Sequence, residues 1–489
     1  MPLALAARWH GEAVPKGPWF HPRPDALEYA ASAQALAQSG RLYLQIGPLQ
    51  LRPRYPPGWP LLLVPALKAG VSGESLWRVT GLFGAALAWL LAWLTTRATK
   101  TIAGSERAAL AAGILAGSLW ALAPIAVGVG QTVLSDEPAA FVSIAGLTLA
   151  GAGFLQGGRR GALVALAGGL AFGLAASMRP VVAVLMAPPL AVFLLGSFRR
   201  FGLRPTLGRS AAWGLGAAVF PAVTVLILLR SGLPAWEWSG YDFWVPQRYA
   251  RLTDTFSLHH ALQPDANFRL AASGRPLSHL GIAARVLLGL PGLRIHHYLG
   301  LFWPIAGWLA AISLLRLGRR RTDVTKIVAA ALLVWTAAHV VLYSLYFYPS
   351  SRFYLAPLAL CAVLFATACG VAFARPELRF RLSALAAAAL VLVLTLQGRR
   401  EMRRDPGPPP RGLDTRERFS TWIALRDRQR RQRPMPFDPV QAQALGLLPP
   451  EVASGIRVWG RLPDTVHVRR LRQKEGLPAV RYNRPRRKE

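Results

Sequence analysis

The chain alternates between long apolar segments and short basic ones. Its apolar residues gather in blocks of about 15–20 without charges, close to the length that a helix needs to cross a bilayer. Ten such blocks predict ten spans, at residues 76–95, 108–127, 138–156, 162–177, 181–195, 211–229, 298–315, 327–345, 353–373 and 382–397. The predicted fold class is therefore an all-α polytopic membrane protein.

Three regions follow from this pattern. Residues 1–75 form a predicted outer loop, with a helix at 25–39 that lies on the membrane surface and an apolar segment at 60–67 that is too short to cross. Residues 76–397 form the membrane module, which includes a long loop at 230–297. Residues 398–489 form a basic tail, which is either a small, partly ordered domain that touches anionic headgroups or a solvated end.

The distribution of basic residues orients the module. With the first loop outside, the inner loops carry 17 arginine and lysine residues, whereas the short outer loops carry only Arg179 and Arg352. Positive residues favour the cytoplasmic side. We therefore expect an inner-membrane protein whose acidic motifs face outward.

Composition removes two other classes of protein. Charged residues make up only 16% of the chain, against about 25% in soluble proteins. The net charge of +34 does not indicate a nucleic-acid binder, because most arginines lie in short loops where membrane topology places them. The sequence also has no Gly-rich phosphate loop. Chemistry on the outer face would then need an activated donor that is already bound to the membrane.

Asp25 begins the predicted surface helix. With Glu28 three residues later it fits a capping box. It also fits a carboxylate that takes a proton from an acceptor hydroxyl at the membrane surface. The two interpretations are compatible, since a cap also holds a carboxylate in place.

A second acidic motif, Ser135-Asp136-Glu137-Pro138, lies at the mouth of a span. Ser135 or Asp136 can cap a helix that has Pro138 in its first turn. Two adjacent carboxylates in a loop without a cation of its own repel each other. A divalent cation such as Mg or Mn, or a positively charged partner, would relieve this repulsion.

Three outer arginines are candidates for phosphate binding. Arg54 and Tyr55 precede a Pro-Pro-Gly-Trp-Pro turn, Arg179 lies between two closely spaced spans, and Arg352 lies at the rim of another. The planar fork of arginine suits phosphate oxygens. The alternative for Arg54 and Tyr55 is an interfacial anchor.

Aromatic residues near these motifs are candidates for contact with a sugar or a lipid chain. They are Tyr29, Trp59, Trp236, Trp238, Tyr241 and Trp244. For the four residues of the long loop, the alternative is an aromatic belt at the membrane interface.

The order of these parts resembles the GT-C superfamily of polytopic glycosyltransferases. Its nearest branches look like the protein mannosyltransferases, the aminoarabinose transferases of lipid A and the dolichyl-phosphate-mannose-mannosyltransferase-like proteins. The resemblance covers about residues 20–370. It rests on Asp25 with Tyr29, on residues 55–63, on Asp136-Glu137-Pro138 and on residues 352–358.

The resemblance implies a GT-C-like bundle that transfers a sugar, with inversion, from a polyprenyl-phosphate donor to a hydroxyl of a lipid, glycan or protein. It implies that Asp25 acts as the base or orients the acceptor. It also implies that Asp136 and Glu137 steady the acceptor or a metal, and that Arg54, Tyr55 and Arg352 hold the donor phosphate. The family usually has a span before its first acidic loop. None precedes Asp25 here, and residues 3–7 fit only the last turn of such a span.

Two other functions stay open. A transporter or flippase for a lipid-linked saccharide would need ionisable residues within the spans, and His339 is the main one. An inactive scaffold of the same fold would fit the missing first span. The outer clustering of the acids favours the enzyme.

Overall fold

The computed structural model describes most of the predicted membrane module and part of the first loop. The described residues are 24–46, 49–51, 53–71, 76–130, 132–236, 238, 252–269, 275–288, 304–305, 307–309, 312, 323–347 and 350–404. The predicted tail beyond residue 404 and most of the predicted span 298–315 lie outside them.

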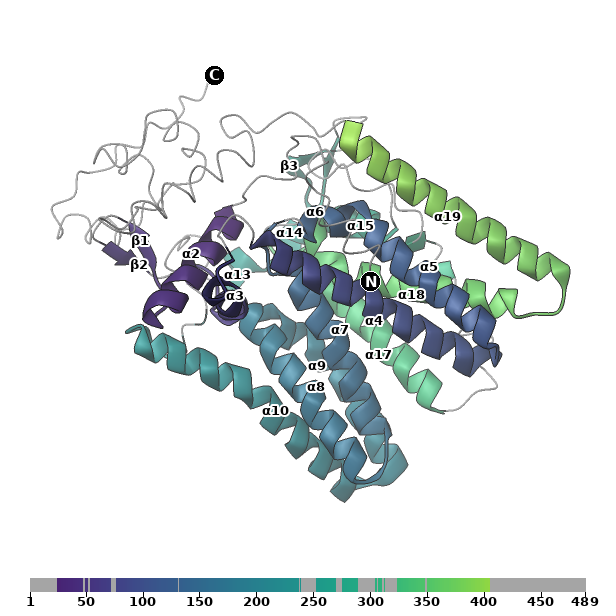
Figure 1. Cartoon of the computed structure of the whole chain (residues 1–489), viewed down its shortest axis with the longest axis horizontal. Helices are drawn as coiled ribbons and strands as arrows, with labels where there is room; N and C mark the ends of the chain where they lie inside the picture. The colour runs from purple at the N-terminus through teal and green to yellow at the C-terminus, as the bar shows by residue number, and fades with distance from the viewer. Residues whose placement is uncertain are drawn as a thin grey trace.

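The described chain is a helical membrane bundle, which confirms the predicted fold class (Figure 1). Eight of its helices are long and apolar enough to cross a membrane, or nine if the bent pair α5 and α6 counts as one span. The spanning elements are α4 (Trp77–Ala103), α5 (Glu106–Leu122) with α6 (Pro124–Gly130), α7 (Asp136–Leu155), α8 (Gly158–Met178), α9 (Val181–Phe201), α10 (Leu203–Arg230), α17 (Asp323–Leu345), α18 (Leu355–Phe373) and α19 (Leu378–Arg404).

Nine of the ten predicted spans correspond to these helices. The fourth and tenth predictions, at 162–177 and 382–397, were short and are longer in the structure, as α8 and α19. Their arginines belong to the helix ends, because a long basic side chain can stay helical while its charged head reaches water. α5 and α6 are bent by 59°, where the predicted span 108–127 was continuous.

The first described part of the chain forms a small layer beside the bundle. α2 (Pro24–Ser39) is rich in alanine, the best helix former, and starts with proline, which fits a first helical position. A hairpin of β1 (Leu44–Ile46) and β2 (Leu49–Leu51) follows, and then α3 (Gly58–Lys68). α2 packs on α3, and α3 packs on α8 (Figure 1).

The bundle is held by close helix contacts. α8 packs between α7 and α10, while α18 packs against α4 and α5. Gly169 of α8 is one reason for the close approach to α10: a Cβ there would lie 2.0 Å from the carbonyl oxygen of Trp213. Small residues let transmembrane helices come this near.

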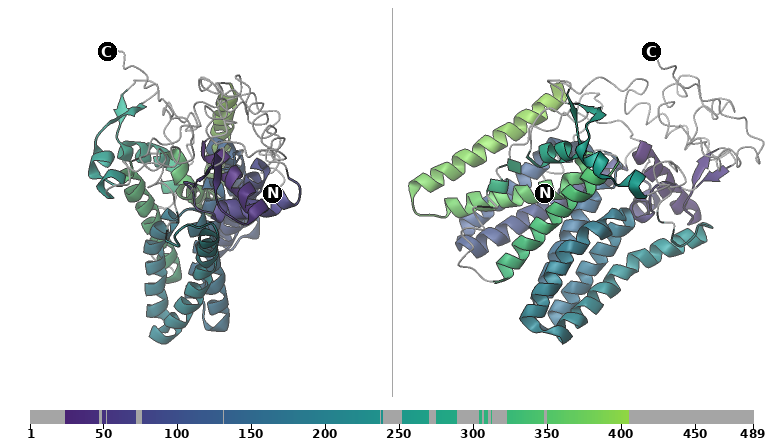
Figure 2. Two further views of the ribbon diagram at one scale, coloured as in Figure 1. Left: turned by 90° about the vertical axis from the view of Figure 1, so that its left-hand side faces the viewer. Right: turned by 180° about the vertical axis from the view of Figure 1, so that it is seen from behind.

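The spans alternate in direction and give the bundle two different ends (Figure 2). The basic end consists of the helix junctions at 103–106, 155–158, 201–203 and 374–378. The motif end consists of residues 53–60, 135–137, 178–181 and 350–355.

The described part of the long loop belongs to the motif end. It contains α13 (Leu252–Thr255), α14 (Leu258–Leu262), β3 (Asp265–Arg269), β4 (Pro276–Leu277) and α15 (His279–Leu288). α15 packs on α17 and on the short 3-10 helix η5 (Ser351–Tyr354). His279 Nδ1 lies 2.8 Å from the carbonyl oxygen of Tyr346, just after α17. The loop therefore packs beside the sequence motif that carries Arg352.

Candidate active site at the motif end

Asp136 is the centre of a buried ionic cluster. It begins α7, is 5% exposed, and forms ion pairs with two arginines from distant parts of the chain. Arg179, between α8 and α9, contacts Oδ1, and Arg352 of η5 places Nη1 3.5 Å from Oδ2. The charge repulsion predicted at Asp136 is thus relieved by a positively charged partner. We call Asp136, Arg179 and Arg352 the ionic triad.

The electrostatics of the triad keep Arg179 charged. Burial lowers the pKa of its guanidinium, but the charge of Asp136, with smaller contributions from Tyr343 and Tyr29, raises that pKa by more, so the pKa lies above its ordinary value. The three side chains carry two positive charges and one negative charge. Such a group can accept a further anion, and guanidinium groups bind phosphate well.

A second buried ion pair joins α2 to the chain before α3. Glu28 is fully buried and accepts from the backbone N–H of Arg54 and, at 2.6 Å, from its Nε. Since α2 begins at Pro24 and Glu28 binds Arg54, the capping box predicted for Asp25 and Glu28 is not what holds Glu28. Breaking a buried pair of this kind from one side costs about 3–5 kcal/mol.

Tyr29 connects the two ion pairs, because it contacts Ser135 through its hydroxyl and Tyr55 through its ring. The hydroxyl groups of Tyr29 and Ser135 lie 2.8 Å apart, next in sequence to Glu28 and Asp136. The ring of Tyr29 lies 4.6 Å from that of Tyr55, which in turn lies under the guanidinium of Arg54. The Ser135 side chain thus contacts α2 instead of capping α7.

Gly58 sets the distance between the first loop and Arg179. It begins α3, and a Cβ there would lie 2.3 Å from the carbonyl carbon of Ser177, in the last turn of α8. No side chain fits in that space without moving one backbone away from the other. Gly58 therefore holds Arg54 and Tyr55 beside the end of α8, which leads directly into Arg179.

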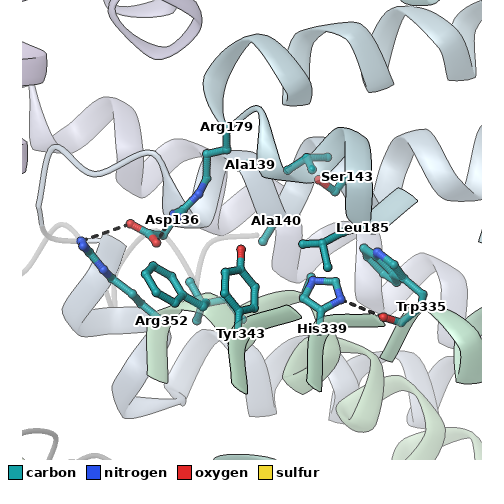
Figure 3. Close-up of a pocket in the computed structure, with 14 residues that line it drawn as sticks. Asp136, Ala139, Ala140, Ser143, Arg179, Leu185, Trp335, His339, Tyr343 and Arg352 are labelled. Carbon is teal, nitrogen blue, oxygen red and sulfur yellow. Dashed lines mark hydrogen bonds and ion pairs between the residues drawn. The ribbon is translucent and has the colours of Figure 1, made fainter. Parts of the chain in front are cut away.

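The triad opens onto a pocket between α7, α9, α17 and α18 (Figure 3). Phe353 forms part of its wall: both triad arginines lie over this ring, at 5.2 Å for Arg179 and 5.7 Å for Arg352. Tyr343 stacks on Phe353 at 4.7 Å. Further residues that line the pocket are Ala139, Ala140, Ser143, Val182, Leu185, Trp335, His339, Leu355 and Ala356.

The structure brings part of the predicted site together. Arg179 and Arg352 meet on Asp136, while Arg54 and Tyr55 join through Tyr29 and Ser135. Glu137 is fully buried in the first turn of α7. Asp25 lies in the first turn of α2, one helical turn before Tyr29, and its side chain lies outside the described residues.

The aromatic residues predicted to contact a sugar or lipid lie in different places in the structure. Trp59 is fully buried and packs edge-on against Phe83, so it is part of the core rather than of the pocket wall. Trp236 is 81% exposed, and Trp238 donates its Nε1–H to the carbonyl of Ala235. Tyr241 and Trp244 lie outside the described residues.

The sequence singled out only His339 of α17, as an ionisable residue within a span, and did not place this helix at the site. Trp335, His339 and Tyr343 all line the pocket. Their spacing of four residues places them on one helix face. That regular spacing was the available signal, but on an apolar helix it is equally typical of core packing.

A divalent cation finds no complete set of ligands in the described part of the chain. No group of three or more His, Cys, Asp or Glu side chains gathers there in a way that could hold a metal. Both oxygens of Asp136 already face guanidinium groups.

Comparison with known proteins identifies the fold. No family model matches the sequence, and no curated protein does. Among solved structures, the chain is similar to the oligosaccharyltransferase AglB from Archaeoglobus fulgidus, in complex with an inhibitory peptide and a dolichol-phosphate. The TM-score is 0.55 at 16% identity, and the match covers 87% of this chain and 57% of the AglB chain. It is also similar to ArnT from Cupriavidus metallidurans, bound to undecaprenyl phosphate. The TM-score is 0.52 at 18% identity, and the match covers 93% of this chain and 73% of the ArnT chain.

These likenesses concern the fold, since the identities are low. The chain spans little more than half the length of AglB. The same bundle is nevertheless found in both proteins, over most of this chain. The chain therefore shares its fold with AglB and ArnT, both GT-C proteins, and the order of its motifs predicted a fold of this kind.

Proposed function

We propose that the chain is an inner-membrane glycosyltransferase that moves a sugar from a polyprenyl-phosphate donor to a hydroxyl group of a lipid, glycan or protein. The ionic triad is the observation that carries this proposal. Two half-buried arginines on one buried carboxylate, at the mouth of a pocket within a membrane bundle, suit the phosphate of a membrane-bound donor. The fold that the chain shares with a dolichol-phosphate complex and an undecaprenyl-phosphate complex supports the same class of donor.

The transfer is a single displacement. The acceptor oxygen forms a bond to the anomeric carbon while the bond from that carbon to the phosphate oxygen breaks, which inverts the anomeric configuration. Asp25 takes the proton of the acceptor hydroxyl. The electron pair of the breaking bond leaves with polyprenyl phosphate, and Arg179 and Arg352 stabilise the negative charge that develops there.

The other residues of the site hold the reacting groups and their neighbours in position. Glu28 fixes Arg54, and Tyr29 ties α2 to Ser135 beside the triad. Arg54 and Tyr55 then face the donor phosphate from the first loop. Asp136 holds the two triad arginines in place and, with Glu137, steadies the acceptor.

The orientation follows from charge. The basic end carries exposed arginines such as Arg159, Arg160, Arg199 and Arg200, and positive residues favour the cytoplasm. The motif end then faces outward, where a lipid-linked donor supplies the sugar without a nucleotide.

A transfer assay tests the proposal. The purified chain in lipid nanodiscs is given a panel of undecaprenyl-phosphate sugars with membrane lipids and peptides as acceptors, and released undecaprenyl phosphate is measured. We expect release by the wild-type chain and a loss of about 100-fold or more in Asp25→Asn, the range of general-base catalysis. Glu106→Gln, the matched change of an exposed acid at the basic end, keeps its activity.

Two results would contradict the proposal. Full activity in Asp25→Asn would remove Asp25 as the base. The chain can also be reconstituted in lipid vesicles. Movement of the lipid-linked sugar across the vesicle bilayer, with no undecaprenyl phosphate released, would indicate a flippase instead, because a flippase leaves its cargo bonded.

A further inference from the structure

The pocket has two chemically different ends (Figure 3). The ionic triad lies at one end. At the other end, Ser143 of α7 lies across from Trp335 and His339 of α17, and Leu185 of α9 completes the wall. The phosphate chemistry proposed for the triad gives the second end no role.

Trp335 presents a buried hydrogen-bond donor at this second end. Trp335 is 1% exposed, and its Nε1–H makes no hydrogen bond within the described part of the chain. Buried N–H groups in folded proteins nearly always have a partner, so one without a partner in the protein requires an explanation. An acceptor on a ligand would supply it.

His339 presents an acceptor one helical turn further on. Its Nδ1 lies 2.9 Å from the carbonyl oxygen of Trp335. A carbonyl oxygen only accepts, so Nδ1 carries the proton, and Nε2 of the neutral ring holds a lone pair. His339 is 4% exposed and lines the pocket. A donor at Trp335 and an acceptor at His339 thus lie on the same helix face.

The size of the space limits what can bind there. The whole pocket, from the triad to Trp335, has a cavity volume of about 40 Å³, and one water needs about 10–15 Å³ of such space. The pocket therefore admits a substituent of about three to four non-hydrogen atoms, such as a hydroxymethyl or an acetamido group, but not a sugar ring.

We infer that the second end of the pocket is a specificity subsite for one neutral polar substituent of the donor sugar, a hydroxyl or an acylamino group. Trp335 Nε1–H donates to the substituent and His339 Nε2 accepts from it. A hydroxyl or a secondary amide both donates and accepts, as these two partners require, whereas an ether or a ketone only accepts. The inference rests on the proposed function, since the triad must hold the donor phosphate at the other end.

The test compares donors that differ in one substituent. Undecaprenyl phosphate carrying glucose is compared with its N-acetylglucosamine counterpart, and galactose with 6-deoxygalactose, by kcat/KM. A site built to hydrogen-bond a substituent rejects the analogue that lacks it. We expect Trp335→Phe and His339→Asn to reduce the wild-type preference within at least one pair by about 10-fold or more.

Matched variants separate recognition from folding. In His339→Asn, the amide can still bond the Trp335 carbonyl but does not reach the position of Nε2, whereas in His339→Gln it does, so we expect His339→Gln to keep most of the preference. Trp89→Phe changes a tryptophan that is 57% exposed on α4 and leaves the preference unchanged. Binding of undecaprenyl phosphate without a sugar stays within about twofold in every variant, because the triad is intact.

Three other results would contradict the subsite or the proposed function. Equal losses on all donors, or a loss of affinity for undecaprenyl phosphate itself, would show that Trp335 and His339 act only on packing and would overturn the subsite. Wild-type turnover with the same preference in Trp335→Phe and His339→Asn would overturn the subsite alone. A wild-type chain that turns over no donor would overturn the proposed function and the subsite with it.

Discussion

Each end of the bundle holds an arginine that is largely shielded from solvent, and the two arginines have different partners. At the motif end Arg179 meets Asp136, with Arg352 on the other carboxylate oxygen. At the basic end Arg209 is 4% exposed and donates to the Ser197 hydroxyl at 3.0 Å, above the ring of Phe201.

The difference shows what distinguishes a site from a structural contact. Arg209 ties α10 to α9 through neutral groups, and it also lies within 3.4 Å of the Phe154 carbonyl oxygen at the end of α7. The ionic triad instead places two positive charges on one carboxylate beside a pocket. Burial of an arginine therefore does not identify the proposed active site; the carboxylate that two arginines share and the adjoining cavity do.

Among the changes that test this comparison of the two ends, the largest expected effect comes from removing the Asp136 carboxylate. Asp136→Asn leaves two half-buried guanidinium groups without their counter-charge, and breaking a buried ion pair from one side costs about 3–5 kcal/mol. We expect a loss of transfer of about 100-fold and a lower unfolding temperature, measured by the release assay and by thermal unfolding in detergent.

The corresponding change at the basic end sharpens the contrast. Arg209→Gln keeps a hydrogen-bonding side chain and strands no carboxylate, so transfer should stay within about twofold of wild type even if the unfolding temperature falls. Equal losses of transfer in Asp136→Asn and Arg209→Gln would remove the distinction between the two ends.

A smaller loss is expected from Gly58→Ala. The added methyl group would overlap the backbone of Ser177 and push the first loop away from Arg179. Misplacing a positioning loop by about 1 Å can cost about 100-fold in rate, and we expect a loss of about 10- to 100-fold in kcat/KM. Gly208→Ala at the basic end, where nothing lies within 4 Å of the new Cβ, serves as the control.

Arg352→Lys should have a moderate effect. Lysine keeps the charge but loses the planar fork and the stacking on Phe353. We expect the KM for the donor to rise by about 10-fold with a smaller change in kcat. Arg200→Lys, at an exposed position of the basic end, leaves both constants unchanged. A normal KM in Arg352→Lys would exclude bidentate recognition of phosphate by this residue.

The smallest effect is expected from a chelator. Because guanidinium groups face both oxygens of Asp136, incubation with EDTA should leave the transfer rate within about twofold. A complete loss in EDTA that is restored by Mg or Mn would place a cation in the mechanism.

The sequence predicted the fold and the positions of the motifs better than their pairing. Hydrophobic blocks located nine of the described spanning segments, because the bilayer fixes the length of each apolar run. Asp136, Arg179 and Arg352 were all candidates, but the contact between Asp136 and Arg179 joins residues 43 positions apart and depends on how α7 packs against α8 and α9.

Local patterns also favoured the wrong partner in two places. Glu28 has the spacing of a capping residue, yet its carboxylate binds Arg54, 26 residues away. Ser135 has the position of a helix cap, yet its hydroxyl meets Tyr29. A buried charge or hydroxyl takes the strongest partner that the tertiary fold supplies, and local spacing does not contain that information.

A structure of the chain in lipid nanodiscs with undecaprenyl phosphate bound tests the central claim most directly. We expect the phosphate at the mouth of the pocket, with its oxygens within hydrogen-bond distance of Arg179 or Arg352 and with Arg54 and Asp25 on the same side of the bundle. A phosphate bound at the basic end, or away from the ionic triad along the lipid-facing surface, would contradict it.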